Sequence, residues 1–148
     1  MKLIKHVLKL KGNNEIWRVE PDTPVYEALK MMADKNVGAL MVMRGEKVIG
    51  VISERDYARK VILLGKSSKE TLVREIMTSP VIYTTPSETI ERCMALMTAK
   101  HIRHLLVKDG EKLAGIVSMG DLVKAVIGSQ KELIRQLENY IQENISIT

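Results

Sequence analysis

The stretch GVISERDYARKVI at positions 50–62 is matched by GIVSMGDLVKAVI at positions 115–127, with five of the thirteen residues identical. Both copies keep a glycine, a serine three residues later and an aspartate three residues after the serine. These are Gly50, Ser53 and Asp56 in the first copy, and Gly115, Ser118 and Asp121 in the second. A repeated segment indicates a repeated structural unit, so this pair is the starting point for the fold.

The match extends well beyond these letters. A shift of 65 positions aligns Pro21 with Pro86 and continues without a gap to Ile62 and Ile127. Within it even the turn sequence Gly-Glu-Lys is repeated. A match of this length indicates that the chain is internally duplicated.

Each copy has a hydrophobic pattern that predicts a strand, a helix, two strands and a second helix. In the first copy we expect these elements at residues 16–19, 25–35, 39–43, 47–52 and 56–64. The second copy repeats the pattern, from a strand at 81–84 to a helix at 121–127. Thr23 is the expected N-cap of the first helix, with Pro24 in its first turn.

The segments that flank the repeats have helical signals of their own. After Gly65, residues 67–70 have the Ser-x-x-Glu spacing of a capping box, ahead of a short helix that ends near Met77. Past Gly128 an amphipathic helix is expected from the apolar residues Leu133, Ile134, Leu137, Ile141 and Ile145. The predicted organisation is an N-terminal segment at 1–15, repeat 1 at 16–64, a linker at 65–80, repeat 2 at 81–127 and a C-terminal helix at 128–148.

The composition indicates a folded protein of a reducing compartment. With 148 residues the chain is long enough to bury a core without disulfides. Its single cysteine, Cys93, has no partner in the chain, no Cys/His group has zinc-ligand spacing, and no apolar run is long enough to cross a membrane. We therefore expect a cytoplasmic protein with no metal site. The net charge of +5 favours anionic partners, but an aromatic content of 3% argues against nucleic acid.

With these features the chain resembles the tandem CBS-domain, or Bateman, module. The resemblance covers residues 16–127 and rests on the paired Gly-x-x-Ser-x-x-Asp motif, the linker VREIMTSPVIYTTP and the stretch HIRHLLVKDGEKLAGIVS. It is closest to small bacterial proteins that consist of the two repeats alone. The resemblance implies an α+β fold of two βαββα repeats related by a pseudo-twofold axis, plus the C-terminal helix. It also implies clefts between the repeats that hold adenine nucleotides, and pairing of modules into a homodimer.

Taken from the residues alone, the Ser-x-x-Asp motif has two interpretations. A serine where a strand gives way to a helix, followed three residues later by a carboxylate, is a capping box that stabilises the helix start. The same helix start offers unpaired amides to a phosphate, and the carboxylate can accept hydrogen bonds from both hydroxyls of a ribose. The resemblance favours this second interpretation for at least one of the two copies.

The resemblance implies nucleotide binding by residues of both repeats, and the sequence leaves open whether Arg55 and Arg103 meet one phosphate or separate ones. The expected nucleotide-binding residues are Ser53, Arg55, Asp56, Thr84, Arg103, His104, Ser118, Gly120 and Asp121. The repeats differ at the start of the middle strand, where Gly38 and Ala39 of the first correspond to Arg103 and His104 of the second. Since arginine pairs well with phosphate, the clefts should be unequal, and we expect the second-repeat cleft to bind at least about ten times more tightly.

These observations predict a regulatory module that binds AMP, ADP, ATP or NAD and acts in trans on an effector protein that the sequence does not identify. The alternative is a ligand-free module whose role is structural and whose surfaces serve dimerisation. Catalysis, and with it a catalytic cofactor, is not expected. Neither Ser53 nor Ser118 has a recognisable activating partner, and Cys93 lies on the apolar face of a predicted helix.

Overall fold

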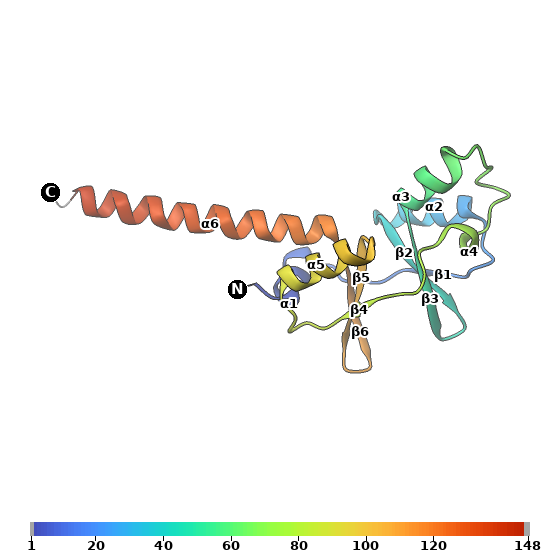
Figure 1. The fold of residues 1–148 in the computed structure, drawn as a ribbon, viewed down its shortest axis with the longest axis horizontal. Helices are drawn as coiled ribbons and strands as arrows, with labels where there is room; N and C mark the ends of the chain where they lie inside the picture. Colours follow the sequence, from blue (N-terminus) through green and yellow to red (C-terminus); the bar gives the residue numbers. More distant parts are fainter. Residues whose placement is uncertain (1, 147–148) are drawn as a thin grey trace. The chain divides into compact units, whose positions relative to one another are not determined.

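The computed structural model describes residues 2–146, which divide into two compact units. The first-repeat unit is Glu15–Tyr83. The second-repeat unit combines the residues up to Asn14 with those from Thr84 onward. Each repeat has its own three-stranded sheet with helices beside it, so the duplication in the sequence is also a duplication of structure (Figure 1).

The first repeat forms a sheet with strand order β1-β2-β3, in which β1 is parallel to β2 and β2 is antiparallel to β3. Its elements are β1 (Arg18–Val19), α2 (Val25–Lys35), β2 (Ala39–Arg44), β3 (Lys47–Ser53), α3 (Glu54–Tyr57), the π-helix η1 (Ala58–Ile62) and α4 (Val73–Ile76). Residues of all three strands and of α2, η1 and α4 share one buried apolar core. The junction at which β3 ends and α3 begins is therefore supported by this packed core.

The second repeat forms a sheet with the equivalent strand order, β4-β5-β6. Its elements are α1 (Ile4–Lys11), β4 (Tyr83–Thr84), α5 (Ile90–Lys100), β5 (His104–Asp109), β6 (Lys112–Ser118) and α6 (Met119–Ser146). The predicted α+β fold of two βαββα repeats and a C-terminal helix is confirmed.

The two β-hairpins lie where the sequence predicts them. Strands β2 and β3 pair through a turn at Gly45, and β5 and β6 pair through a turn at Gly110. Both glycines have left-handed φ values, 63° and 65°, which glycine adopts without a steric cost. The repeated turn sequence therefore has a conformational reason.

Several predicted boundaries and caps are wrong. Helix α2 begins at Val25 with Pro24, and not Thr23, as its N-cap. The expected capping box at 67–70 does not start a helix; α4 begins at Val73 instead, where the Glu75 carboxylate accepts a hydrogen bond from the Leu72 amide. A correct capping spacing is therefore not sufficient, because the helix starts where apolar residues can reach the core.

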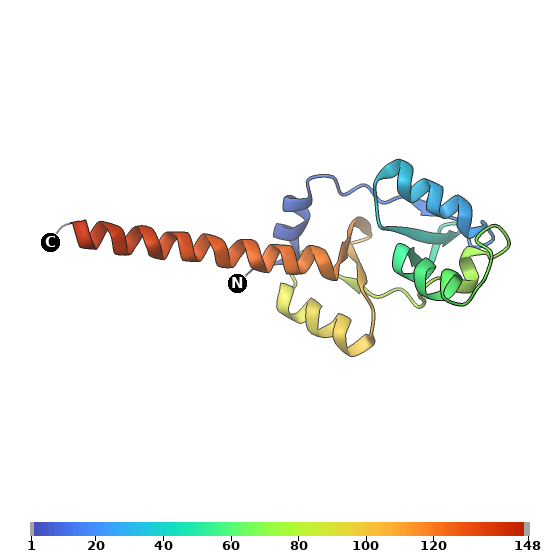
Figure 2. The same ribbon diagram turned by 90° about the horizontal axis from the view of Figure 1, so that it is seen from above.

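The C-terminal helix differs most from its prediction. Helix α6 is continuous over Met119–Ser146, so the expected separate helices at 121–127 and 128–148 are one element (Figure 2). Gly128 lies inside it, where a glycine costs only about 1 kcal/mol relative to alanine. The apolar spacing continues across this glycine and no residue near it takes a left-handed cap conformation. The side chain of Ile145, expected on the apolar face, lies outside the described part of the structure.

Each repeat is completed by a segment that contacts its first long helix in the same way. In the first-repeat unit Pro24 forms a β-bridge with Leu72, just before α4. In the second-repeat unit Thr89, which aligns with Pro24, forms the same bridge with Leu3, just before α1. The backbone bonds repeat too: the Val73 amide donates to the Thr23 carbonyl at 2.8 Å, and the Ile4 amide donates to the Glu88 carbonyl at 2.9 Å. Helix α1 therefore has the role in the second repeat that α4 has in the first.

Candidate functional site

In the first repeat, the Ser-x-x-Asp motif is a complete and buried capping box. The Asp56 amide donates to Ser53 Oγ at 3.2 Å, and the Ser53 amide and hydroxyl both donate to Asp56 Oδ2 at 3.0 Å. The other carboxylate oxygen, Oδ1, accepts from the Thr78 hydroxyl at 3.3 Å and lies 3.3 Å from the Lys60 ammonium. Both oxygens of Asp56 are engaged within the protein, and the side chain is 12% exposed.

The second repeat has the same box in a more open form. The Asp121 amide donates to Ser118 Oγ at 3.0 Å, and the Ser118 amide donates to Asp121 Oδ2 at 2.9 Å. The Lys11 ammonium also lies 2.9 Å from Oδ2, while Oδ1 accepts no hydrogen bond from any described residue. The Asp121 side chain is 23% exposed, twice the fraction of Asp56. One carboxylate oxygen thus remains available to a ligand.

The surroundings of Asp121 favour its charged form. Burial opposes ionisation, but the hydrogen bonds from Ser118 and from Lys11 and the positive charge of Lys11 outweigh it, so the pKa of Asp121 lies below the ordinary 3.8. The carboxylate is therefore an acceptor at neutral pH. It can accept hydrogen bonds from the hydroxyls of a sugar, but it cannot donate one.

Two of the predicted cationic residues lie beside this box. His104 begins β5 and is paired in register with Ser118, so the two side chains are neighbours across the strands. Arg103 precedes it, with its carbonyl accepting from the Met119 amide at 2.9 Å and its side chain exposed. The structure brings these residues to the end of β6, where α6 begins.

The remaining predicted residues are placed differently. Thr84 is buried, and its hydroxyl lies 3.2 Å from the Cys93 sulfur, inside the second-repeat unit. Gly120 is exposed in the first turn of α6, where an added Cβ would come 3.6 Å from Ser118 Oγ. Arg55 is an exposed residue of α3. Within its own unit, Thr84 is therefore engaged with the core.

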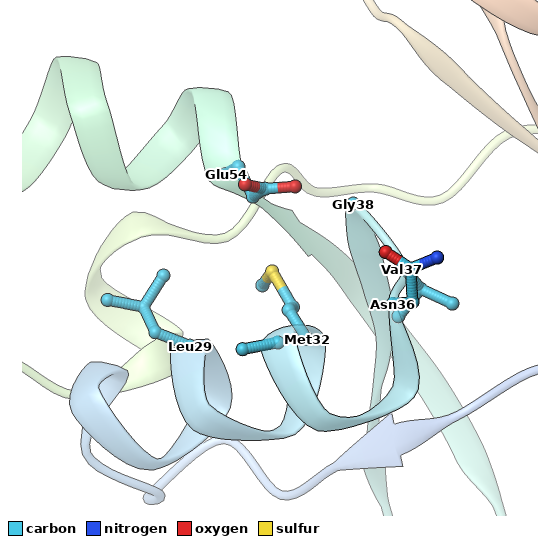
Figure 3. Close-up of a pocket in the computed structure, with 7 residues that line it drawn as sticks. Leu29, Met32, Asn36, Val37, Gly38 and Glu54 are labelled. Atoms are coloured by element: carbon cyan, nitrogen blue, oxygen red, sulfur yellow. The ribbon is translucent and has the colours of Figure 1, made fainter.

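A cavity of about 270 Å³ lies in the first-repeat unit next to, but not at, its capping box. Figure 3 shows Glu54 facing Leu29 and Met32 of α2 across it, with Gly38 at one side. Neither the motif serine nor the motif aspartate lines it. Because its charged group is a carboxylate, this cavity would repel a phosphate.

Sequence reasoning missed three residues that contact the motif aspartates: Lys11, Lys60 and Thr78. A second internal match could have found the first. A shift of 69 positions aligns Leu3-Ile4-Lys5 with Leu72-Val73-Arg74, and these segments make equivalent bridges in their units. The shift of 65 that relates the repeats does not align these two segments, because α1 is longer than α4 by one helical turn. Lys11 lies on that extra turn.

Other chemistry has little support in the described residues. Burial raises the pKa of the Cys93 thiol, against a hydrogen bond with Thr84 that lowers it, so the sulfur is a poor nucleophile at neutral pH. Within residues 2–146 no group of three or more His, Cys, Asp or Glu side chains is placed to hold a metal ion. No helix in this range has the length and apolar character needed to cross a membrane.

Comparisons with known proteins identify both repeats. A family model of the CBS domain matches residues 13–62 and 73–128. The mitochondrial CBS domain-containing protein CBSX3 of Arabidopsis thaliana is 43% identical, in an alignment of 148 positions that covers 94% of this chain and 71% of that protein. The solved structure of a CBS-domain protein from Burkholderia ambifaria is 48% identical, with a TM-score of 0.78, over 87% of this chain and 96% of that one.

A more distant structure shares the fold. The CBS domain pair of protein MJ0100 was solved in complex with 5′-methylthioadenosine and S-adenosyl-L-methionine. It is 24% identical, with a TM-score of 0.71, and the match covers 87% of this chain and 98% of that one.

Proposed function

Because this chain belongs to the CBS-domain family, we propose that it is a regulatory module that binds an adenosine nucleotide at Ser118 and Asp121 and acts on an effector protein in trans. Pairs of CBS domains are generally regulatory and bind adenosine-containing ligands, as MJ0100 does. AMP, ADP, ATP and NAD are the ligands we propose. The alternative, a ligand-free structural module, would use the same fold with the capping boxes serving stability alone.

The observation that supports the proposal best is the free oxygen of Asp121. Ser118 and Lys11 engage Oδ2, while Oδ1 accepts no hydrogen bond among the described residues. A ribose hydroxyl can donate to this oxygen without breaking the capping box. His104 and Arg103 lie at the same end of the sheet, where they can meet a phosphate.

The start of α6 adds a further contribution. Its first amides have no partner one turn earlier in the helix, and its dipole favours negative charge at this end. A helix of 28 residues has a full dipole, and its first turn carries the motif aspartate. The site therefore combines an acceptor for a sugar with a positive potential for a phosphate.

A thermal-shift screen tests the proposal. A ligand at a hundred times its Kd stabilises the folded state by about 2.7 kcal/mol, which for a chain of this length raises Tm by roughly 5–11 °C. We expect such a rise with at least one of AMP, ADP, ATP and NAD at millimolar concentration. An unchanged Tm with all four would favour the ligand-free structural module.

We also propose that the chain forms a homodimer. The exposed apolar residues of α6 support this: they are Val123, Ile127, Leu133, Ile134, Leu137, Tyr140 and Ile141. Apolar surface of this extent marks an interface in soluble proteins. Light scattering at micromolar concentration should give twice the chain mass of 16.7 kDa, and a stable monomer would contradict the proposal.

A cytoplasmic location is proposed as well, and the single cysteine supports it, because exported proteins of this size more often carry disulfides. Cell fractionation followed by immunodetection of the chain checks this, and recovery outside the soluble cytoplasmic fraction would contradict it.

A further inference from the structure

Lys11 is held at the Ser118–Asp121 box by several independent contacts. Its ammonium lies 2.9 Å from Asp121 Oδ2 and donates a second hydrogen bond to the Ile116 carbonyl at 2.7 Å. The lysine side chain is 27% exposed, so the charge is partly withdrawn from water. A lysine with two protein acceptors in such a position is more localised than a typical surface lysine.

Helix α1, which carries Lys11, is itself anchored on the second repeat. The Ile4 amide donates to the Glu88 carbonyl at 2.9 Å, and the Ile90 amide donates to the Lys2 carbonyl at 3.1 Å. Leu8 packs so closely on Gly115 that an added Cβ there would come 2.8 Å from the leucine side chain. Lys11 therefore reaches the box from a rigid helix, and not from a flexible segment.

The first repeat has no equivalent of this lysine. The matching helix, α4, ends at Ile76, and the chain then presents the neutral Thr78 hydroxyl to Asp56. Lys60 contacts the same carboxylate, but on the oxygen that in the second repeat is free. Of the two motif aspartates, only Asp121 has a cation on one carboxylate oxygen and a second oxygen that accepts no hydrogen bond from a described residue.

We propose that Lys11 makes the Ser118–Asp121 site selective for anionic adenosine ligands over neutral or cationic ones. The inference rests on the proposed function, since it requires a ribose to bind Asp121. A ribose on Oδ1 leaves the Lys11 ammonium beside the ligand. The lysine then attracts a phosphate, has little effect on a plain nucleoside and repels the sulfonium of S-adenosylmethionine.

Isothermal titration calorimetry with three probes tests this inference. AMP, adenosine and S-adenosylmethionine share the base and ribose and differ in charge. The variants are Lys11→Met, which removes the charge, Lys11→Arg, which keeps it, and Lys9→Met, which changes an exposed lysine of the same helix as a control. Thermal unfolding of each variant establishes that the fold is intact.

We expect Lys11→Met to weaken AMP binding about tenfold, because a charge-assisted contact is lost. In the same variant, adenosine affinity should change by less than about threefold and S-adenosylmethionine affinity should rise. Lys11→Arg and Lys9→Met should both keep the preference for AMP. An equal loss of affinity for AMP and adenosine would mean that Lys11 has a structural role only, and would overturn the inference. Unchanged AMP affinity in Lys11→Met would overturn it as well. If the wild type binds none of the three probes, and ADP, ATP and NAD also leave its Tm unchanged, the proposed function itself fails, which is a different result.

A second inference comes from the spacing of residues along α6. Ile127, Ile134 and Ile141 are seven residues apart, and Leu137 lies three residues after Ile134, as in positions a and d of a coiled coil. These four side chains are all exposed. In both views the C-terminal half of α6 extends beyond α1 and α5, with no other described element of its unit beside it (Figures 1 and 2).

The charges beside this stripe favour an antiparallel partner. Lys131 and Glu138 occupy equivalent flanking positions one heptad apart, and neither forms an ion pair with a described residue. In an antiparallel pair centred between Ile134 and Leu137, Lys131 of each helix faces Glu138 of the other. In a parallel pair Glu138 would instead face Leu133, which leaves the carboxylate without a partner.

We infer that two copies of this chain associate through antiparallel pairing of their α6 helices. Light scattering across a dilution series should show that Lys131→Glu weakens the dimer about tenfold, while Lys131→Glu combined with Glu138→Lys restores it. Lys112→Glu, on the exposed hairpin of β5 and β6, serves as the control and should have no effect. A monomeric wild type, or a double variant as weak as the single one, would overturn the inference.

Discussion

The two repeats contain the same Ser-x-x-Asp motif, but the contacts of its aspartate differ between them. In the first, both oxygens of Asp56 are taken by Ser53, Thr78 and Lys60, and the side chain is nearly sealed from solvent. In the second, Lys11 contacts Oδ2 of Asp121, and Oδ1 accepts no hydrogen bond from the part of the chain that the structure describes. The difference teaches that duplication preserves the helix cap in both copies, while the segments packed beside each cap determine which carboxylate oxygens are engaged within the protein.

The largest expected effect is a difference in how much the two motif aspartates contribute to the free energy of unfolding. Asp56→Ala leaves the buried Ser53 amide and hydroxyl and the Thr78 hydroxyl without their acceptor, so it should cost about 3 kcal/mol. Asp121→Ala should cost only about 1–2 kcal/mol, because water can reach the groups it leaves behind. Urea unfolding of both variants measures this. Equal losses would show that the two boxes are equally structural.

Replacing the glycine ahead of each motif by alanine should also destabilise the first repeat more than the second. An alanine Cβ at position 50 would come 2.7 Å from the Met77 sulfur and 3.0 Å from the Thr78 carbonyl oxygen, which the backbone holds in a β-bridge with Val51. At position 115 the closest contact, at 2.8 Å, is the end of the Leu8 side chain, which can move. We expect Gly50→Ala to cost about 2 kcal/mol and Gly115→Ala about 1 kcal/mol, measured by chemical unfolding. The reverse order would contradict this account of the packing.

A smaller effect concerns the pH dependence of the Lys11–Asp121 pair. The pKa of Asp121 is lowered in the folded state, so the pair stabilises the fold above the ordinary value of 3.8 and loses this contribution as pH falls through the lowered value. Lys11→Met should therefore cost about 1 kcal/mol at pH 7 and less below about pH 4. Unfolding curves between pH 3 and pH 7, with Lys9→Met as control, provide the check. A penalty independent of pH would mean that the lysine acts through packing alone.

Much of the fold follows from local patterns, and the unequal sites are predicted from Arg103 and His104, but the contact of Lys11 with Asp121 is not. The hairpins at Gly45 and Gly110 are predicted well, because the turn residues and the apolar residues of the two strands lie next to one another in the chain. The contact of Lys11 with Asp121 joins residues 110 positions apart. No local pattern indicates it.

Two wrong predictions of where helices begin and end also arise because local sequence does not show tertiary packing. The capping-box spacing at 67–70 is locally valid, yet the helix begins at Val73, where the side chain is buried in the core. Gly128 is locally a helix breaker, yet α6 continues through it because apolar residues on both sides keep one helical period. Tertiary packing and helix length override single-residue preferences in both places.

The central claim is that the second repeat, and not the first, holds the adenosine ligand. Titration calorimetry with AMP on wild type, Asp56→Asn and Asp121→Asn tests it most directly, because asparagine keeps the size of the side chain and removes the charge. Asp121→Asn should lower the affinity by at least about tenfold, while Asp56→Asn should bind AMP within about threefold of wild type. Normal binding by Asp121→Asn together with lost binding by Asp56→Asn would contradict the claim and place the ligand on the first repeat.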